Sequence, residues 1–451
     1  MQKTESRQPK AESRKLIYTT IKVFRTLRYR NFRLFFIGQS VSLIGTWMQQ
    51  VAMYWLVYRI SNSPLLLGIV GFSSQIPAFI LSPFTGVFVD RANKHRIIMV
   101  TQILSMLQAV IFVVLIYSGH ISIWHIVVLG IFLGCVNSFD IPARQAFLVE
   151  MVAKKEDLSN AIPLNSLMFN AARLIGPSIA GIVIAVANEG VCFLINAISF
   201  LGVIIALALM DVKPKKIDLG KAKIFETLKE GFAYAFGFVP IRLILFLLAI
   251  VSLMGASYIV LMPVFAKDIL GGGASTLGFL MASGSAGAVF ATLYIASRSS
   301  VLGLGRMIPI SSSLFSIGLI LFSFCRIYWL SLVLLAVTGF GMMVHMAASN
   351  IILQTIVDDD KRGRIMSLYT MAFIGTVPVG SLFAGALASR IGATATLTIG
   401  GVTCLLGSII FAVNLPIIKK MIHPIYKRIG VIKEVASGLG AATTLSVPTE
   451  E

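Results

Sequence analysis

The chain has 451 residues, of which 57% are hydrophobic and only 13% are charged. A soluble protein of this length needs a larger charged fraction on its surface, so the composition excludes a globular enzyme held by one membrane anchor. An outer-membrane barrel is excluded as well, because barrel strands alternate polar and apolar residues and the apolar runs here are continuous. We therefore predict an all-α membrane protein.

Twelve apolar runs are long enough to cross a bilayer, since one helical crossing takes about 20 apolar residues. The first six predicted spans are 31–58, 64–89, 97–118, 121–147, 161–187 and 190–210. The second six are 241–266, 274–297, 307–325, 327–356, 365–389 and 392–415. The first run is longer than the core of a cleavable signal, so we expect it to be retained as a span.

Positive charge is distributed unequally on the two sides of these spans. Of the 38 Lys and Arg, 33 lie on the side that carries the N-terminal arm 1–30, and the net charge is +19. An excess of Lys and Arg in short loops marks the cytoplasmic side. We therefore predict that both termini are cytoplasmic, and we interpret the basic excess as a topology signal and not as a nucleic-acid site.

The longest polar connection, 211–240, divides the spans into an N-terminal bundle, 31–210, and a C-terminal bundle, 241–415. A cytoplasmic tail, 416–451, follows. Apolar residues recur at helical spacing within the connection and predict an amphipathic helix at the cytoplasmic interface: Ile224, Phe225, Leu228, Phe232 and Phe236.

The two halves are related by a weak internal repeat. Shifting one half by 204 residues superposes Gly176 on Gly380 and Gly181 on Gly385. A duplicated pair of six-helix bundles places a cavity between the halves near the bilayer midplane, which suits a rocking transporter.

The loop between the second and third spans carries a family resemblance. Gly86, Asp90, Arg91 and Arg96 in GVFVDRANKHR resemble the cytoplasmic loop signature of the major facilitator superfamily, although Asn93 and His95 depart from its pattern. The stretch FDIPARQAFLVEMV, with LSNAIPLNS and RLIGPSIAG after it, resembles the branch that contains the enterobactin exporter. The resemblance implies the major facilitator fold, with twelve helices in two pseudo-symmetric six-helix bundles of a bacterial inner membrane protein.

The resemblance also implies a role for this loop in gating. Asp90 would lie at the beginning of span eleven, near Gly363, with Arg144 at the end of span four as a second partner. A carboxylate is stabilised at the positive N-terminal end of a helix. We expect this cluster, together with Gly86, Arg91 and Arg96, to stabilise one access state; the alternative is a cluster that only retains the loop in the cytosol.

Charged residues within the spans are few, and each is costly unless it is paired or hydrated. Asp140 lies toward the cytoplasmic half of span four, and Arg173 lies near the middle of span five. We predict that they pair, and that Asp140 accepts a proton when the pair separates. The alternatives are that Asp140 satisfies backbone groups beside Pro142, and that His345 in span ten titrates instead or is a packed core residue.

Uncharged polar and aromatic side chains lie at intramembrane positions of both halves. They suit a large amphipathic substrate with scattered polar atoms, and they lack the charged side chains that would select a small ion. The predicted substrate-cavity residues are Gln39, Trp47, Gln50, Tyr54, Asn137, Asn165, Asn170, Tyr258 and Asn350.

Several chemistries have no motif in this sequence. There is no GxxxxGK[ST] phosphate loop and no HExxH, and the four Cys are scattered singly. We therefore predict no metal, no cofactor and no enzymatic activity. The predicted function is a monomeric secondary transporter that exports amphipathic small molecules, such as siderophores or drugs, by alternating access and proton antiport. The alternatives are a lipid or lysophospholipid flippase on the same scaffold, and a non-transporting membrane sensor or partner-binding protein.

Overall fold

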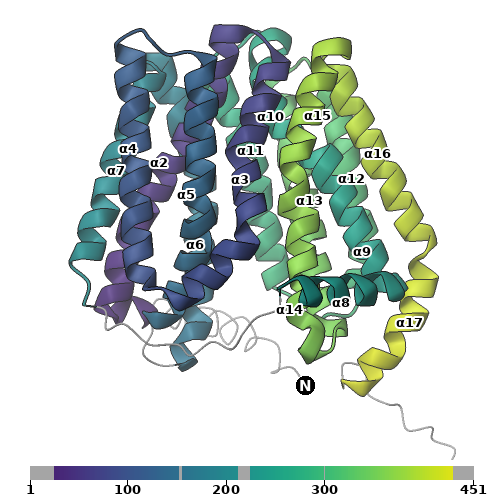
Figure 1. Ribbon diagram of the computed structural model, residues 1–451. Helices are drawn as coiled ribbons and strands as arrows, with labels where there is room; N and C mark the ends of the chain where they lie inside the picture. Colours follow the sequence, from purple (N-terminus) through teal and green to yellow (C-terminus); the bar gives the residue numbers. More distant parts are fainter. Residues whose placement is uncertain (1–24, 152–154, 212–223, 299, 430–451) are drawn as a thin grey trace, which may run out of the picture.

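The computed structural model describes residues 25–151, 155–211, 224–298 and 300–429, and every regular element in these ranges is helical (Figure 1). Six long helices form the N-terminal half. Their bounds are α2 Arg30–Ser61, α3 Pro64–Arg91, α4 Lys94–Tyr117, α5 Ile123–Glu150, α6 Lys155–Val186 and α7 Glu189–Ala208, and the short 3-10 helix η1, Arg25–Arg28, precedes them.

The C-terminal half also has six membrane-length segments, two of which contain π-helical turns. The first runs through α9 Val239–Ile250, η2 Val251–Ala256, α10 Tyr258–Val264 and η3 Phe265–Ile269. The fifth runs through α14 Asp359–Thr370, η4 Met371–Gly375 and α15 Thr376–Ile391. The other four are α11 Ala274–Ala296, α12 Leu304–Phe324, α13 Tyr328–Ile356 and α16 Ala393–Val413.

Eleven of these segments, within the described ranges, are long and apolar enough to cross a membrane. The remaining predicted span coincides with α2, which has 32 residues but contains the amides Gln39, Gln49 and Gln50. Because α2 packs along α6 and α7, it is part of the same bundle. The fold is thus the expected all-α membrane architecture of two six-helix bundles.

The packing of glycines shows that the two halves are pseudo-symmetric. A β-carbon at Gly176 of α6 would lie 2.6 Å from Trp47 of α2, and one at Gly380 of α15 would lie 2.1 Å from the carbonyl oxygen of Leu253 in η2. Spans five and eleven therefore contact spans one and seven at equivalent positions. The glycines that the internal repeat superposes therefore allow equivalent helix pairs in the two halves to approach closely.

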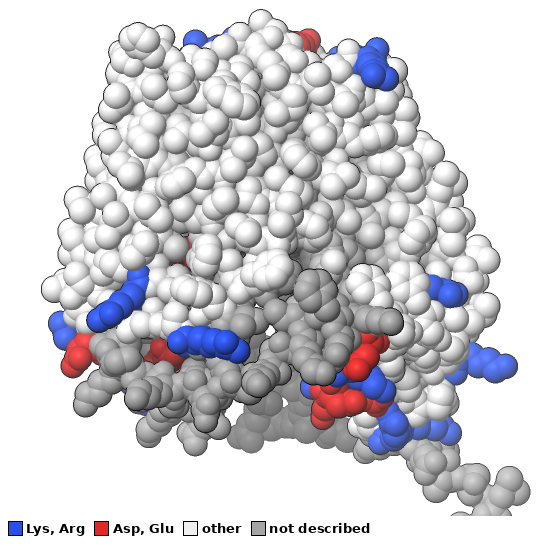
Figure 2. Space-filling model, viewed as in Figure 1, with Lys and Arg blue, Asp and Glu red and all other residues white. Residues whose placement is uncertain are grey.

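One end of the molecule carries most of the positive charge, and we call it the basic end. It is the end where α2 begins and α16 ends, at the bottom of Figures 1 and 2, and only a few charged side chains are visible at the opposite, far end. Two further helices lie at the basic end of the C-terminal half: α8, Ile224–Gly237, and α17, Leu415–Arg428. The expected interfacial helix of the connection coincides with α8.

Among the described residues, the closest approaches between the helix backbones of the two halves lie toward the far end. There α3 packs against α15 and α6 packs against α11. A β-carbon at Gly68 would lie 2.7 Å from the carbonyl oxygen of Ser381, and one at Gly278 would lie 2.4 Å from that of Pro177. Toward the basic end, a β-carbon at Gly86 would meet no described atom within 4 Å. Among the described residues the halves are therefore closed against each other at the far end, and Gly86 makes no such close approach at the basic end.

Candidate functional site

A guanidinium lies at the centre of the molecule, where the two halves face each other. Arg173 is near the middle of α6, and its Cζ is 5.7 Å from the centroid of the Trp47 ring on α2, which is a cation–π distance. Trp47 in turn meets the Phe169 ring edge-on, with 5.8 Å between ring centroids. From the C-terminal half, Tyr258 of α10 is close enough to interact electrostatically with Arg173. Side chains of both halves thus surround one half-buried cation.

Arg173 has no acidic partner in the described part of the chain, because none of the ion pairs found there includes it. A guanidinium retains its charge at any pH that a protein meets. An intramembrane cation is costly when it is neither paired nor hydrated. The site therefore holds a permanent positive charge that is available to an anionic group.

Asp140 does not pair with Arg173, so this prediction is wrong. Its Oδ2 is 2.6 Å from a guanidinium nitrogen of Arg144, one turn further along α5, and its Oδ1 accepts hydrogen bonds from Thr101 (2.7 Å) and Gln102 (3.0 Å) of α4. The carboxylate is buried and fully partnered within the N-terminal half.

The reason lies in the heights of the two residues along their helices. Asp140 is ten residues before the end of α5, whereas Arg173 is eighteen residues after the beginning of α6. At 1.5 Å per residue, this difference separates them by about 12 Å along the bundle. Sequence adjacency of two antiparallel spans did not reveal that difference.

The cytoplasmic-signature loop is anchored to its own half. Asn93, one departure from the family pattern, caps α4 by accepting the backbone N–H of Arg96 (3.1 Å). His95, the other departure, lies 2.9 Å from the Leu207 carbonyl oxygen through Nε2. Both departures thus have structural roles. The loop's gating role remains a prediction.

The other predicted gating residues are not joined into one cluster among the described side chains. Arg91 and Arg96 are exposed at the ends of α3 and α4, and Arg144 binds Asp140 instead of the loop. The side chain of Asp90 lies outside the described residues.

The predicted cavity residues fall into two groups. Gln50, Asn137, Asn165, Asn170 and Asn350 are half-buried, as Trp47 is. Tyr54 and Gln39 are buried at 2% exposure, and Tyr258 is buried at 8%. Tyr54 belongs to the apolar core, while the amide oxygen of Gln39 has no hydrogen-bond partner. For the half-buried amides, a place in a substrate cavity remains a prediction.

Two further polar groups lie buried inside the membrane. His345 is fully buried in α13, neither of its ring nitrogens has a hydrogen-bond partner among the described residues, and its role remains a prediction. Gln49 donates to Gln108 (2.9 Å) and accepts from Asn196 (2.7 Å), which links α2, α4 and α7 inside the N-terminal half. Gln49 and Gln108, which sequence position alone would place in a cavity, are therefore core hydrogen-bonding residues.

A polar cluster that the sequence analysis missed joins the halves at the far end. Tyr58 of α2 donates a hydrogen bond to Asp268 of η3, and the Lys267 ammonium donates to the side-chain oxygen of Asn62 at 2.6 Å. The same ammonium lies 5.5 Å from the Tyr58 ring centroid. We call these four residues the far-end latch. The signal in the sequence that could have indicated this cluster is the adjacent pair Lys267 and Asp268 at the end of span seven, on the side where charged residues are scarce.

Several bacterial transporters resemble this chain over nearly their whole length. The staphyloferrin A transporter of Staphylococcus aureus is 28% identical over 380 residues, which cover 84% of this chain and 94% of the relative. The multidrug efflux pump Tap of Mycolicibacterium fortuitum is 24% identical and is covered over 93% of its length. The macrolide efflux protein A of Streptococcus pyogenes is 21% identical and is covered over 92%.

Solved structures show the same fold at low sequence identity. A bacterial homolog of the human lysosomal transporter Spinster, in an inward-facing unoccupied conformation, superposes with a TM-score of 0.66 at 13% identity; the match covers 88% of this chain and 98% of that one. A bacterial homologue of the iron transporter ferroportin, in an inward-facing state, gives 0.64 at 16% identity and covers 86% of this chain and 98% of that one.

A family model described as transmembrane secretion effector matches residues 21–426. Together with the two-bundle fold and the efflux relatives, this match shows that the chain is a multi-pass membrane transporter that belongs to this efflux branch of the major facilitator superfamily.

Proposed function

We propose that the chain exports amphipathic small molecules that carry an acidic group, by alternating access coupled to proton entry. It would act in a bacterial plasma membrane with both termini cytoplasmic, as the positive-inside rule indicates. The observation that carries this proposal is Arg173, a cation that has no acidic partner among the described residues and is packed on Trp47.

The chemistry of this site matches an acidic amphipathic ligand. A carboxylate accepts two parallel N–H donors from a guanidinium, and such charge-assisted pairs are about twice as strong as neutral hydrogen bonds. The faces of Trp47 and Phe169 offer apolar contact beside that charge, and Asn170 adds an amide on the same helix. The names of the relatives, a siderophore transporter and two drug-efflux proteins, support export of molecules in this size class.

Alternating access is consistent with close backbone contacts between the halves at the far end. With cytoplasmic termini, the basic end would face the cytoplasm, and the present state would admit substrate from that side. Conversion to the opposite state would break the far-end latch and the glycine contacts. It would also bring the loop of Asp90 toward the beginning of α14, where a carboxylate is stabilised by the helix end.

The test of the substrate class compares Arg173→Gln with Arg173→Lys in reconstituted vesicles. The probes are a fluorescent amphipathic carboxylate and its methyl ester. We expect Arg173→Gln to reduce carboxylate transport at least 10-fold and to leave the ester within about 2-fold, with partial recovery in Arg173→Lys. Arg326→Gln, in an exposed position at the far end, is the matched control.

Equal losses for the carboxylate and the ester in Arg173→Gln would contradict recognition of the acid. Movement of a headgroup-labelled lipid, without transport of either probe, would favour the flippase alternative. A protein that moved none of these molecules would contradict a transport function for these substrate classes.

Proton coupling is assigned in this proposal to Asp140, whose carboxylate would be released from Arg144, Thr101 and Gln102 in one access state. Asp140→Asn should abolish transport that is driven by an imposed pH gradient, while substrate exchange without a gradient continues. Substrate-dependent proton flux, followed with a pH-sensitive dye, measures the difference. If the gradient still drove transport fully in Asp140→Asn, Asp140 would not be the proton carrier.

A further inference from the structure

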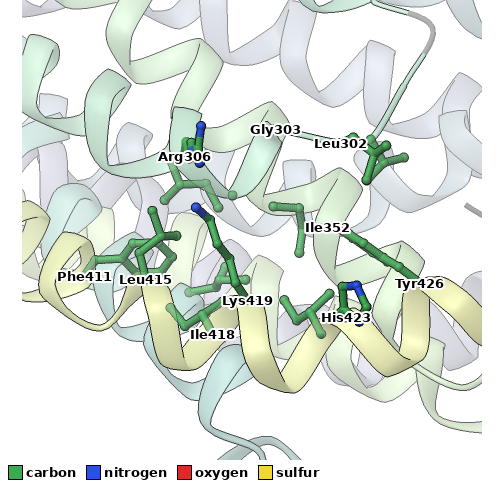
Figure 3. A pocket seen from close by; sticks show the side chains of 15 residues that line it. Leu302, Gly303, Arg306, Ile352, Phe411, Leu415, Ile418, Lys419, His423 and Tyr426 are labelled. Atoms are coloured by element: carbon green, nitrogen blue, oxygen red, sulfur yellow. The ribbon is translucent and has the colours of Figure 1, made fainter. Parts of the chain in front are cut away.

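A pocket lies away from the central site, at the basic end of the C-terminal half. Helix α17 closes it against α12 and α13, and its volume is about 350 Å³ (Figure 3). Ligand pockets in proteins begin at about this size. Its walls are largely apolar and include Ile244, Ile308, Ile352, Phe411, Ile418 and Ile422. The pocket could therefore hold a hydrocarbon chain.

The remaining lining residues give the pocket a single sign of charge. Arg306, Lys419 and His423 line it, and no Asp or Glu does. Neither Arg306 nor Lys419 forms an ion pair among the described residues. In Figure 3 the Lys419 side chain extends across the pocket toward Arg306. Two cations that converge without an acid favour an anion between them.

The helix that closes the pocket is strongly amphipathic. Ile418 and Ile422 are buried against the bundle, while Lys419, Lys420 and Lys427 are exposed, and of these three only Lys419 lines the pocket. An amphipathic helix with a basic polar face is typical of the membrane interface. We therefore expect the pocket's cations to lie at the depth of the lipid headgroups.

We propose that this pocket binds an anionic phospholipid of the cytoplasmic leaflet. One acyl chain lies in the pocket against its apolar walls. The phosphate lies between Arg306 and Lys419, with His423 beside it. Basic pockets between membrane helices on the cytoplasmic side are a recurrent way to hold anionic headgroups. A free phosphate ion would satisfy the cations but would leave the apolar volume unfilled. The site is separate from the central one and goes beyond the proposed function.

A bound lipid would stabilise the contacts that α17 makes with a moving part of the transporter. Arg428 of α17 donates to Asp358 at 2.9 Å, and Asp358 directly precedes α14. Because α14 is the basic-end part of span eleven, the lipid would connect the membrane surface to a helix that changes position during transport.

The test measures retention of phosphatidylglycerol relative to phosphatidylcholine by native mass spectrometry of the full chain. We expect the double variant Arg306→Gln/Lys419→Gln to bind phosphatidylglycerol about 25-fold more weakly, since each cation near the surface contributes about one fivefold factor. Lys420→Gln, on the exposed face of the same helix, is the matched control and should change binding less than 2-fold. Val301→Trp fills the pocket from a half-buried position and should also weaken binding.

Equal losses in the double variant and in Lys420→Gln would show diffuse surface attraction and would overturn the proposal. A loss in the double variant without one in Val301→Trp, together with full competition by inorganic phosphate, would show a simple anion site and would overturn it as well. Thermal unfolding of each variant in detergent distinguishes loss of lipid binding from loss of the fold. A folded double variant that still bound phosphatidylglycerol normally would also contradict the proposal.

Discussion

The two ends of this transporter differ in whether their polar and close-packed contacts join the two halves or lie within one half. At the far end, contacts cross between the halves: Gly68 approaches Ser381, Gly278 approaches Pro177, and Tyr58 binds Asp268. At the basic end, the charged pairs of the described residues are formed within one half.

Four ion pairs at the basic end illustrate this. Arg144 binds Asp140, and Lys94 binds Glu150 at 3.0 Å, both within the N-terminal half. Arg364 binds Glu230 at 2.7 Å, and Arg428 binds Asp358, both within the C-terminal half. Under the proposed alternating-access cycle, we expect the far-end contacts to set the access state and the basic-end pairs to maintain each half as a unit. Substitutions at the two ends should therefore have different readouts.

The largest effect is expected from Gly278→Val. A β-carbon at this position would already lie 2.4 Å from the Pro177 carbonyl oxygen, and overpacking costs about 1–3 kcal/mol. The closed far end should lose population by roughly 5- to 150-fold, which spin-label distances across the far end would measure. Gly273→Val is the control, because a β-carbon there meets no atom within 4 Å. An unchanged distance distribution in Gly278→Val would contradict our assignment of the closed end.

Glu150→Gln should destabilise the N-terminal half without changing the access state. It leaves the Lys94 ammonium unpaired, although that side chain is only 6% exposed and lies at the positive end of α4, where a cation is disfavoured. The cost is about 1–3 kcal/mol, visible as a lower midpoint of thermal unfolding. A shift in the far-end distances of this variant would show that the pair also acts between the halves.

Asp268→Asn should weaken the far-end latch by about 1 kcal/mol, because the hydrogen bond from Tyr58 loses its ionised acceptor. The expected change in the access equilibrium is about 5-fold toward the open far end, again measured by spin-label distances. Glu189→Gln is the matched control: it removes the pair with Arg59 (2.6 Å) at the same end but within one half. If both variants shifted the equilibrium equally, the latch would have no special role.

The smallest effect is expected from Arg364→Gln. The guanidinium is 32% exposed and its partner Glu230 is 60% exposed, and such surface pairs contribute about 0.2–1 kcal/mol. Transport should stay within about 2-fold, and any effect should disappear in high salt. A salt-resistant loss of transport would mean that the contact between α8 and α14 is part of the working cycle.

Local composition predicted most of the fold. Apolar runs gave the positions of the spans, and the repeat that aligns Gly176 with Gly380 anticipated equivalent contacts in the two halves. The amides of α2 lower its hydropathy below that of the other spans, but Gln49 is satisfied inside the bundle by Gln108 of α4 and Asn196 of α7. A hydropathy pattern records how many polar groups a helix has, but not whether they face a partner.

The central site was predicted only in part, for the same physical reason. Arg173 and Trp47 do lie together between the halves, but the proposed partner of Arg173 was wrong. Pairing depends on height and rotation along the helices, and neither can be deduced from two charges on adjacent spans. The far-end latch joins residues about 210 positions apart in the chain, and no local pattern reports such a contact.

The π-helical turns distinguish the halves in mechanical terms. Segments η2 and η4 lie near the middle of spans seven and eleven and are bridged by a hydrogen bond of 2.7 Å from Ser252 to the carbonyl oxygen of Phe373. Their counterparts in the first half, α2 and α6, are uninterrupted α-helices. A π turn inserts one extra residue into the helix, so we expect these two spans to bend at midheight during transport. On this expectation the C-terminal half bends against an N-terminal half that acts as a stiff frame.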